Sequence, residues 1–86
     1  MPGGYIDTSI NFGLQNFLLT QKDTSDGTYD YYGFQNKKGT VVIMRTDKAF
    51  DNILYYSVNG TFSTVFAGKS GYTYVTPKDI VIPAVS

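Results

Sequence analysis

The 86-residue sequence contains no cysteine, no histidine, no glutamate and no tryptophan. Without cysteine, disulfide bonds and thiolate zinc sites are excluded, and without histidine a metal ion would have to be held by oxygen ligands alone. The most common catalytic base and the common thiol nucleophile are missing as well. We therefore expect a protein that is not an enzyme and that has no catalytic residues, no metal site and no cofactor.

Charge and hydropathy restrict the partners. Seven Lys and Arg residues balance seven Asp residues, so the formal net charge is zero. Nucleic-acid-binding modules usually carry an excess of basic residues, and a membrane-spanning helix needs about 20 apolar residues in succession, which this sequence lacks. We expect no nucleic-acid partner and no membrane insertion. Residues 1–4 lack the basic start of a secretory signal, so we expect synthesis in the cytoplasm.

The short chain has little material for a core. A domain of this size buries only about 60–65% of the surface of its unfolded chain, and small domains are usually supported by disulfides, metals or oligomerisation. Because disulfides are excluded and a metal would have only oxygen ligands, we favour a homo-oligomer or another assembly with neighbouring chains.

The residues that are abundant favour strands. Thr, Val and Ile are frequent, and 8 Tyr and 6 Phe accompany them. We predict an all-β fold, a small and mainly antiparallel β-barrel or sandwich of five to seven short strands. Residues 1–9 are expected to form an extended N-terminal arm, residues 10–82 a single β domain, and residues 83–86 a C-terminal tail.

Two hairpins are predicted in the middle of the chain. Strands over 28–35 and 40–46 are joined by 36–39, and a flush four-residue loop would place Gln35 opposite Thr40 and Asp30 opposite Arg45. Further on, Asn59-Gly60 has the chemistry of a type I′ turn, which predicts a second hairpin formed by 53–58 and 61–66.

The flanking segments give weaker patterns. Residues 10–20 fit either a helix or a strand with a bulge, and the strand is favoured because the segment runs directly into turn residues. After Gly68 and its turn we expect a short strand over 72–75, one helical or 3₁₀ turn over 76–79, and a last strand over 80–82.

Three weak patterns in the sequence could indicate metal binding or catalysis. Residues 23–30 look faintly like a calcium loop but lack the Glu that an EF-hand requires, so turn formation is favoured. Lys69 and Ser70 are adjacent on a Gly-bounded turn, which favours a solvated loop over a Ser–Lys catalytic pair. A small enzyme that uses two converging Asp carboxylates is the weakest functional alternative.

The most informative side chains are tyrosines and the apolar residues near the chain ends. Neighbouring tyrosines in a strand point to opposite faces, and packing in the core is the favoured role for most of them. Tyr is also enriched at interfaces, and apolar end segments are suited to pairing with a neighbouring chain. The candidate interface residues are therefore Tyr5, Ile6, Tyr31, Tyr56, Tyr72, Tyr74, Ile80 and Ile82.

Residues 31–45 carry a resemblance to a known group of proteins. The pattern is Tyr31-Tyr32-Gly33-Phe34, then Asn36 and Gly39, and then Val42-Ile43-Met44-Arg45. It resembles small β-rich proteins encoded among the structural genes of tailed bacteriophages. The resemblance implies a non-enzymatic virion component (capsid decoration, neck, tail or fibre-associated) whose partners are other virion proteins and whose location is the virion. The alternative is a small ligand- or carbohydrate-binding β module that uses outward tyrosine rings.

Overall fold

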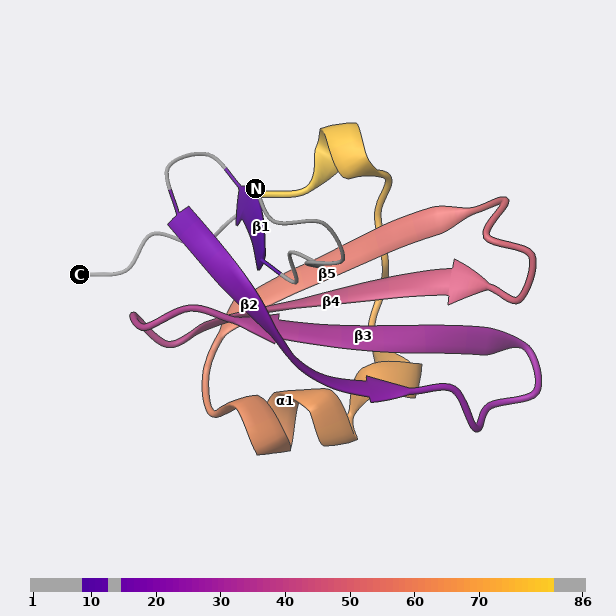
Figure 1. The fold of residues 1–86 in the computed structure, drawn as a ribbon, viewed down its shortest axis with the longest axis horizontal. Helices are drawn as coiled ribbons and strands as arrows, with labels where there is room; N and C mark the ends of the chain where they lie inside the picture. Colours follow the sequence, from indigo (N-terminus) through magenta and orange to yellow (C-terminus); the bar gives the residue numbers. More distant parts are fainter. Residues whose placement is uncertain (1–8, 13–14, 82–86) are drawn as a thin grey trace, which may run out of the picture.

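A computed structural model describes residues 9–12 and 15–81, with the backbone alone described at 9–12 and 15–16. The chain forms an antiparallel meander in which each strand pairs with the next, in the order β1-β2-β3-β4-β5 (Figure 1). The strands are β1 (Ser9–Phe12), β2 (Gln15–Asp23), β3 (Tyr29–Gln35), β4 (Thr40–Asp47) and β5 (Ile53–Asn59). They are followed by α1 (Phe62–Ala67) and two 3₁₀ turns, η1 (Lys69–Gly71) and η2 (Pro77–Asp79).

The expectation of a mostly β, antiparallel protein is confirmed. Within 9–12 and 15–81, no pairing joins β1 to β5, so closure into a barrel or sandwich is not confirmed. Ser9, assigned to the arm, belongs to β1, while the rest of the expected arm and the tail at 83–86 lie outside the described residues.

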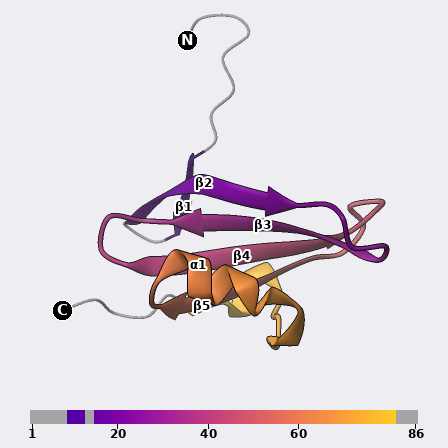
Figure 2. The same cartoon turned by 90° about the horizontal axis from the view of Figure 1, so that it is seen from below.

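The preference for strand over helix at residues 10–20 is confirmed in the described part of that segment, which contributes to two strands. The register between β2 and β3 shifts between Leu19 and Gln21. Such an irregularity adds a residue to one strand and bends it. The bend carries the first half of β2, together with β1, over the side of the sheet opposite α1, as both views show (Figures 1 and 2).

The first predicted hairpin exists, but the predicted register is wrong by one residue. Gln35 pairs with Val41 rather than Thr40, and Asp30 pairs with Thr46 rather than Arg45. The reason is the turn, in which Gly39 N–H donates to the Asn36 carbonyl (3.4 Å) and Gly39 has a φ of 89°. A type I turn followed by a left-handed residue forms a three-residue loop, so Asn36 and Thr40 become the closing pair.

The second predicted hairpin is wrong beyond its first strand. β5 forms as expected, but its partner is β4, and residues 62–67 form α1 instead of a strand. Phe62, Val65 and Phe66 have the i, i+3, i+4 spacing of one helix face, and they pack on the sheet. This apolar contact prevails over the strand propensity of the β-branched and aromatic residues in the segment.

The C-terminal expectations are partly confirmed. The 3₁₀ turn with Pro77 at its start is present, whereas the strand expected at 72–75 is reduced to a single bridge between Val75 and Tyr55. Ile80 and Val81 are not in a strand, so the last predicted strand is wrong over its described part, because η2 redirects the chain after Val75. Ile82 lies outside the described residues.

Both faces of the sheet carry apolar side chains. On the helix face, α1 covers Tyr31, Val41 and Ile43 with Val65 and Phe66. On the opposite face, which we call the β1 face, a second cluster is formed by the buried residues Phe17, Phe34 and Val42 and by the partly buried Leu19, Tyr32, Met44, Tyr55 and Ile80. The structure therefore has two small cores, one on either side of the sheet.

Two fully buried threonines of β4 allow a matched stability test. The Thr40 hydroxyl donates to Asn59 Oδ1 at 2.7 Å, whereas the Thr46 hydroxyl is buried and has no hydrogen-bond partner among the residues that the structure describes. We expect Thr46→Val to leave stability unchanged or raise it by up to about 1 kcal/mol, because it removes an unsatisfied group, and Thr40→Val to lower it by about 1 kcal/mol. Urea unfolding followed by circular dichroism measures both, and a loss of stability in Thr46→Val would contradict the assignment.

Candidate functional site

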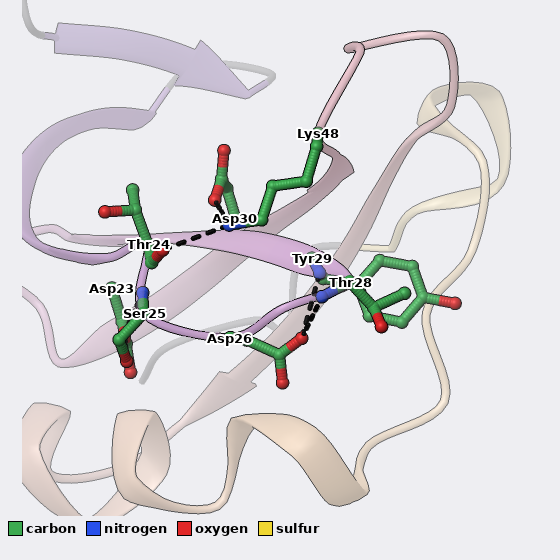
Figure 3. Close-up of polar contacts among 8 residues, drawn as sticks. All are labelled: Asp23, Thr24, Ser25, Asp26, Thr28, Tyr29, Asp30 and Lys48. Atoms are coloured by element: carbon green, nitrogen blue, oxygen red, sulfur yellow. Dashed lines mark hydrogen bonds and ion pairs between the residues drawn. The ribbon is translucent and has the colours of Figure 1, made fainter.

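The Asp-rich loop between β2 and β3 is a network of turns (Figure 3). Asp23 Oδ1 accepts hydrogen bonds from the backbone N–H of Ser25 (2.9 Å) and from its hydroxyl (2.6 Å). Asp26 Oδ1 accepts from the backbone N–H groups of Thr28 (2.7 Å) and Tyr29 (3.0 Å). Across 9–12 and 15–81, no cluster of three metal-ligating residues occurs, and these two carboxylates bind their own loop, as turn-forming Asp residues do.

Two lysines connect this loop to the rest of the fold. Lys48, at the β4–β5 turn, forms an ion pair with Asp30 and donates to the Thr24 carbonyl at 3.0 Å (Figure 3). Lys69, at the start of η1, lies 3.0 Å from Asp23 Oδ2. The Lys69 ammonium is thus directed to a carboxylate, and its neighbour Ser70 is exposed.

Acid should loosen this loop. Hydrogen bonds from the Ser25 side chain and backbone, followed by Lys69, hold the pKa of Asp23 below its ordinary value of 3.8, and the backbone N–H groups of Tyr29 and Thr28 lower the pKa of Asp26. A carboxyl group with a lowered folded-state pKa stabilises the fold above the unfolded-state pKa, and this contribution is lost as the pH falls through the folded-state pKa.

We therefore expect the free energy of unfolding to fall as the pH drops below about 4, and to fall less steeply in Asp23→Asn. Urea titrations at a series of pH values measure the slope. Asp51→Asn, which alters another exposed loop carboxylate, is the matched control variant. Equal slopes for Asp23→Asn and the wild type would contradict the role of the Asp23 network.

The helix face carries a cluster of aromatic and cationic side chains beside its core. The Arg45 guanidinium carbon lies 4.3 Å from the ring centroid of Tyr29 and 4.6 Å from that of Tyr74. Tyr56 and Tyr72 stack with their centroids 4.1 Å apart. Guanidinium–ring and ring–ring contacts of this kind hold side chains in place at a modest energetic gain. We call Tyr29, Arg45, Tyr56, Tyr72 and Tyr74 the tyrosine–arginine cluster.

Two hydroxyls of this cluster bind the chain that follows α1. Tyr72 donates to the Val65 carbonyl and Tyr74 to the Lys69 carbonyl, each at 2.7 Å. Burial raises the pKa of the Tyr74 hydroxyl above its ordinary value of 10.0, so it remains a donor at neutral pH. These bonds attach residues 72–74 to the end of α1 and to η1.

Exposed apolar side chains also lie at the start of β5 and beside Ser57 farther along the strand. Phe50 is 51% exposed, Ile53 37% and Val81 79%. Phe50 lies in the turn before β5 with a φ of 60°, which is unusual for a bulky residue, and Ser57 of β5 donates to the Val81 carbonyl at 2.6 Å. We call Phe50, Ile53 and Val81 the β5 strip.

The outer edge of β5 lies beside this strip. Tyr55 exchanges two backbone hydrogen bonds with Val75, at 2.7 and 2.8 Å, so its N–H and C=O point away from β4. Ile53 and Ser57 have the same orientation in the strand, and within 9–12 and 15–81 neither lies opposite a further strand. An incompletely paired edge of this kind is a template for strand addition.

A shallow hollow of about 220 Å³ lies between β5 and the segment after η1. It is open to solvent. Its lining combines aromatic, hydroxyl, carboxyl and aliphatic groups, from Tyr55, Tyr56, Ser57, Thr73, Val75, Asp79, Ile80 and Val81.

Five of the eight candidate interface residues are described, and four of these, all tyrosines, have their rings close together on the helix face. Tyr31 is 3% exposed and belongs to the core, while three further tyrosines are partly buried in the tyrosine–arginine cluster and Ile80 packs on the β1 face. The three tyrosines are Tyr56, Tyr72 and Tyr74. Tyr5, Ile6 and Ile82 lie outside the described residues.

Sequence reasoning missed the β5 strip and Arg45. Phe50 had a detectable signal, since it is an aromatic residue within a segment of turn-forming Asp and Asn residues. The exposure of Ile53 and Val81 depends on how η2 returns the chain to β5, and no local pattern encodes that path.

Comparison with known proteins places no relative beside this chain. No protein-family model, curated protein or solved structure matches it significantly. Within the part of the chain that the structure describes, no helix is long and apolar enough to cross a membrane.

Proposed function

We propose that this chain is a non-enzymatic structural subunit that acts through protein–protein contacts, and that its assembly is the virion of a tailed bacteriophage. The observation that supports an assembly role is the β5 strip beside an incompletely paired strand edge. Exposed apolar side chains next to free backbone groups are the features by which a sheet adds a strand from a neighbour. The virion is the assembly implied by the resemblance at residues 31–45.

In this proposal the neighbour is a second copy of the chain or another virion protein, and it docks along β5. Its strand completes the sheet into a barrel or sandwich, a closure that residues 9–12 and 15–81 do not form by themselves. The chain is made in the host cytoplasm and is incorporated into the capsid, neck, tail or fibre region. A neighbouring strand paired with β5 would also stabilise this chain of 86 residues, because its own two cores are small.

Charge placed on the strip tests the proposal. In a phage carrying the variant gene, we expect Ile53→Lys with Val81→Lys to reduce incorporation into purified virions at least tenfold. The control pair Ser63→Lys with Thr64→Lys adds the same charge at exposed positions of α1 and should be incorporated normally. Thermal unfolding of both purified variants separates incorporation from folding. Normal incorporation of a folded strip variant would show that β5 is not the contact surface.

A carbohydrate-binding module is the second candidate, and the hollow beside β5 is the observation that favours it. Tyr55 contributes an aromatic side chain, while Thr73 and Asp79 contribute oxygens suited to sugar hydroxyls. Titration of the full chain with a panel of oligosaccharides should then shift NMR signals of residues lining the hollow. Shifts that saturate there, with normal particle assembly by the strip variant, would favour this candidate over the assembly role.

A further inference from the structure

We infer that Arg45 is a receptor for a carboxylate group, held in the binding geometry by Tyr29 and Tyr74. This site lies on the helix face, whereas the assembly surface proposed above is β5, so either can fail independently of the other. Its ligand is defined by chemistry alone, as a planar monoanionic carboxylate.

The Arg45 guanidinium contacts two aromatic rings and keeps its hydrogen-bond donors. The rings of Tyr29 and Tyr74 lie within 5 Å of the Arg45 guanidinium carbon, at 4.3 and 4.6 Å. Arg45 is half-buried, and over residues 9–12 and 15–81 it makes neither a hydrogen bond nor an ion pair. Guanidinium N–H donors point outward in the plane of the group, where a carboxylate accepts two of them in parallel.

Nearby carboxylates do not take this role, because other donors hold them. Asp47 accepts hydrogen bonds from the Asp51 backbone N–H (2.7 Å) and the Asn52 side chain (3.0 Å). Asp23 is held by Lys69 and Ser25, and Asp26 by the backbone of its own turn. Arg45 is therefore a cation fixed by rings and left without an anionic partner by its own chain.

The same surroundings select the ligand class. A carboxylate is planar and can lie in the plane of the guanidinium, whereas phosphate carries oxygens out of that plane. This difference favours a carboxylate over phosphate, whether the carboxylate belongs to a free small acid or to a peptide.

The direct test is a titration of the full chain at constant ionic strength, followed by the NMR signal of the Arg45 side-chain Nε–H. Acetate should produce a saturable shift, with half-saturation at least fivefold lower in concentration than for inorganic phosphate or chloride. Arg45→Lys keeps the charge but loses the planar donor pair, and ring signals of Tyr29 and Tyr74 should then no longer respond to acetate.

Two further arms identify the source of the carboxylate. A short peptide with a free C-terminal carboxylate is compared with its C-terminal amide, and tighter binding of the free acid than of acetate assigns a peptide ligand. Equal binding of the free acid and acetate assigns a small acid. Shifts that are linear and the same for acetate, phosphate and chloride would overturn the inference, and so would an unchanged acetate response in folded Arg45→Lys.

Discussion

Phe17→Ala should destabilise the domain by about 3–5 kcal/mol, which is the usual cost of removing a fully buried phenylalanine ring. Phe17 is completely buried, and it forms the second core with Phe34 and Val42. The bend in β2 carries it onto the β1 face. Since small domains are stable by only about 5–15 kcal/mol, this loss would remove a large part of the total stability.

The neighbouring residue provides the control. Leu18 lies next in the same strand, points to the other side and is 57% exposed, so Leu18→Ala should cost less than about 1 kcal/mol. Urea unfolding followed by circular dichroism and tyrosine fluorescence compares the two variants, since the chain has no tryptophan. Similar small losses for both variants would mean that β2 does not close over the β1 face.

Gly33→Ala should be the second strongly destabilising change, with an expected loss of about 1–3 kcal/mol from overpacking. A Cβ atom at Gly33 would lie 2.6 Å from the Phe62 ring and 2.7 Å from the Phe66 ring. These two rings stack on each other, with centroids 5.4 Å apart, so neither can move aside freely. The absence of a side chain at Gly33 therefore lets α1 approach the middle of β3.

Gly27→Ala isolates this packing effect from the general consequence of replacing glycine. A Cβ atom at Gly27 meets nothing within 4 Å, so the substitution should change stability by less than about 0.5 kcal/mol. Thermal unfolding of the two variants gives the comparison. Equal stability of Gly33→Ala and Gly27→Ala would contradict the close packing of α1 on β3.

Local sequence patterns correctly predicted those elements whose residues are compatible with only one secondary structure. The strands around Asn36 and Gly39 and the 3₁₀ turn at Pro77 follow from turn and proline chemistry that acts over a few residues. The register failed because a three-residue and a four-residue loop share the same turn residues. A single residue of difference then changes every cross-strand pair.

The prediction at residues 61–66 failed for a non-local reason. Asn59-Gly60 favours a tight turn and the following residues favour strand, but β5 already has β4 as its partner. The apolar side chains on the helix face of the sheet would otherwise be exposed to solvent. Phe62, Val65 and Phe66 cover them, because their spacing places them on one face of a helix. Tertiary packing therefore decides between strand and helix in this segment, and the local sequence does not encode that packing.

The candidate surfaces were predicted less well than the fold. Tyrosine was a sound indicator of importance, because Tyr56, Tyr72 and Tyr74 do cluster, but they cluster around a cation and the core. The environment of Arg45 joins β3, β4 and the segment after η1, and the β5 strip joins a turn to a residue near the end of the chain. Contacts between segments so far apart in sequence become visible only in the folded chain.

We propose that this chain is a structural component of a virion, and the protein composition of the particles tests this proposal most directly. Virions of the phage whose genome encodes the chain would be purified on a density gradient, and the chain would be quantified by mass spectrometry against the major capsid protein. We expect a fixed, multiple copy number per particle that is retained after washing in high salt. Complete absence of the chain from intact, infectious particles would contradict the claim.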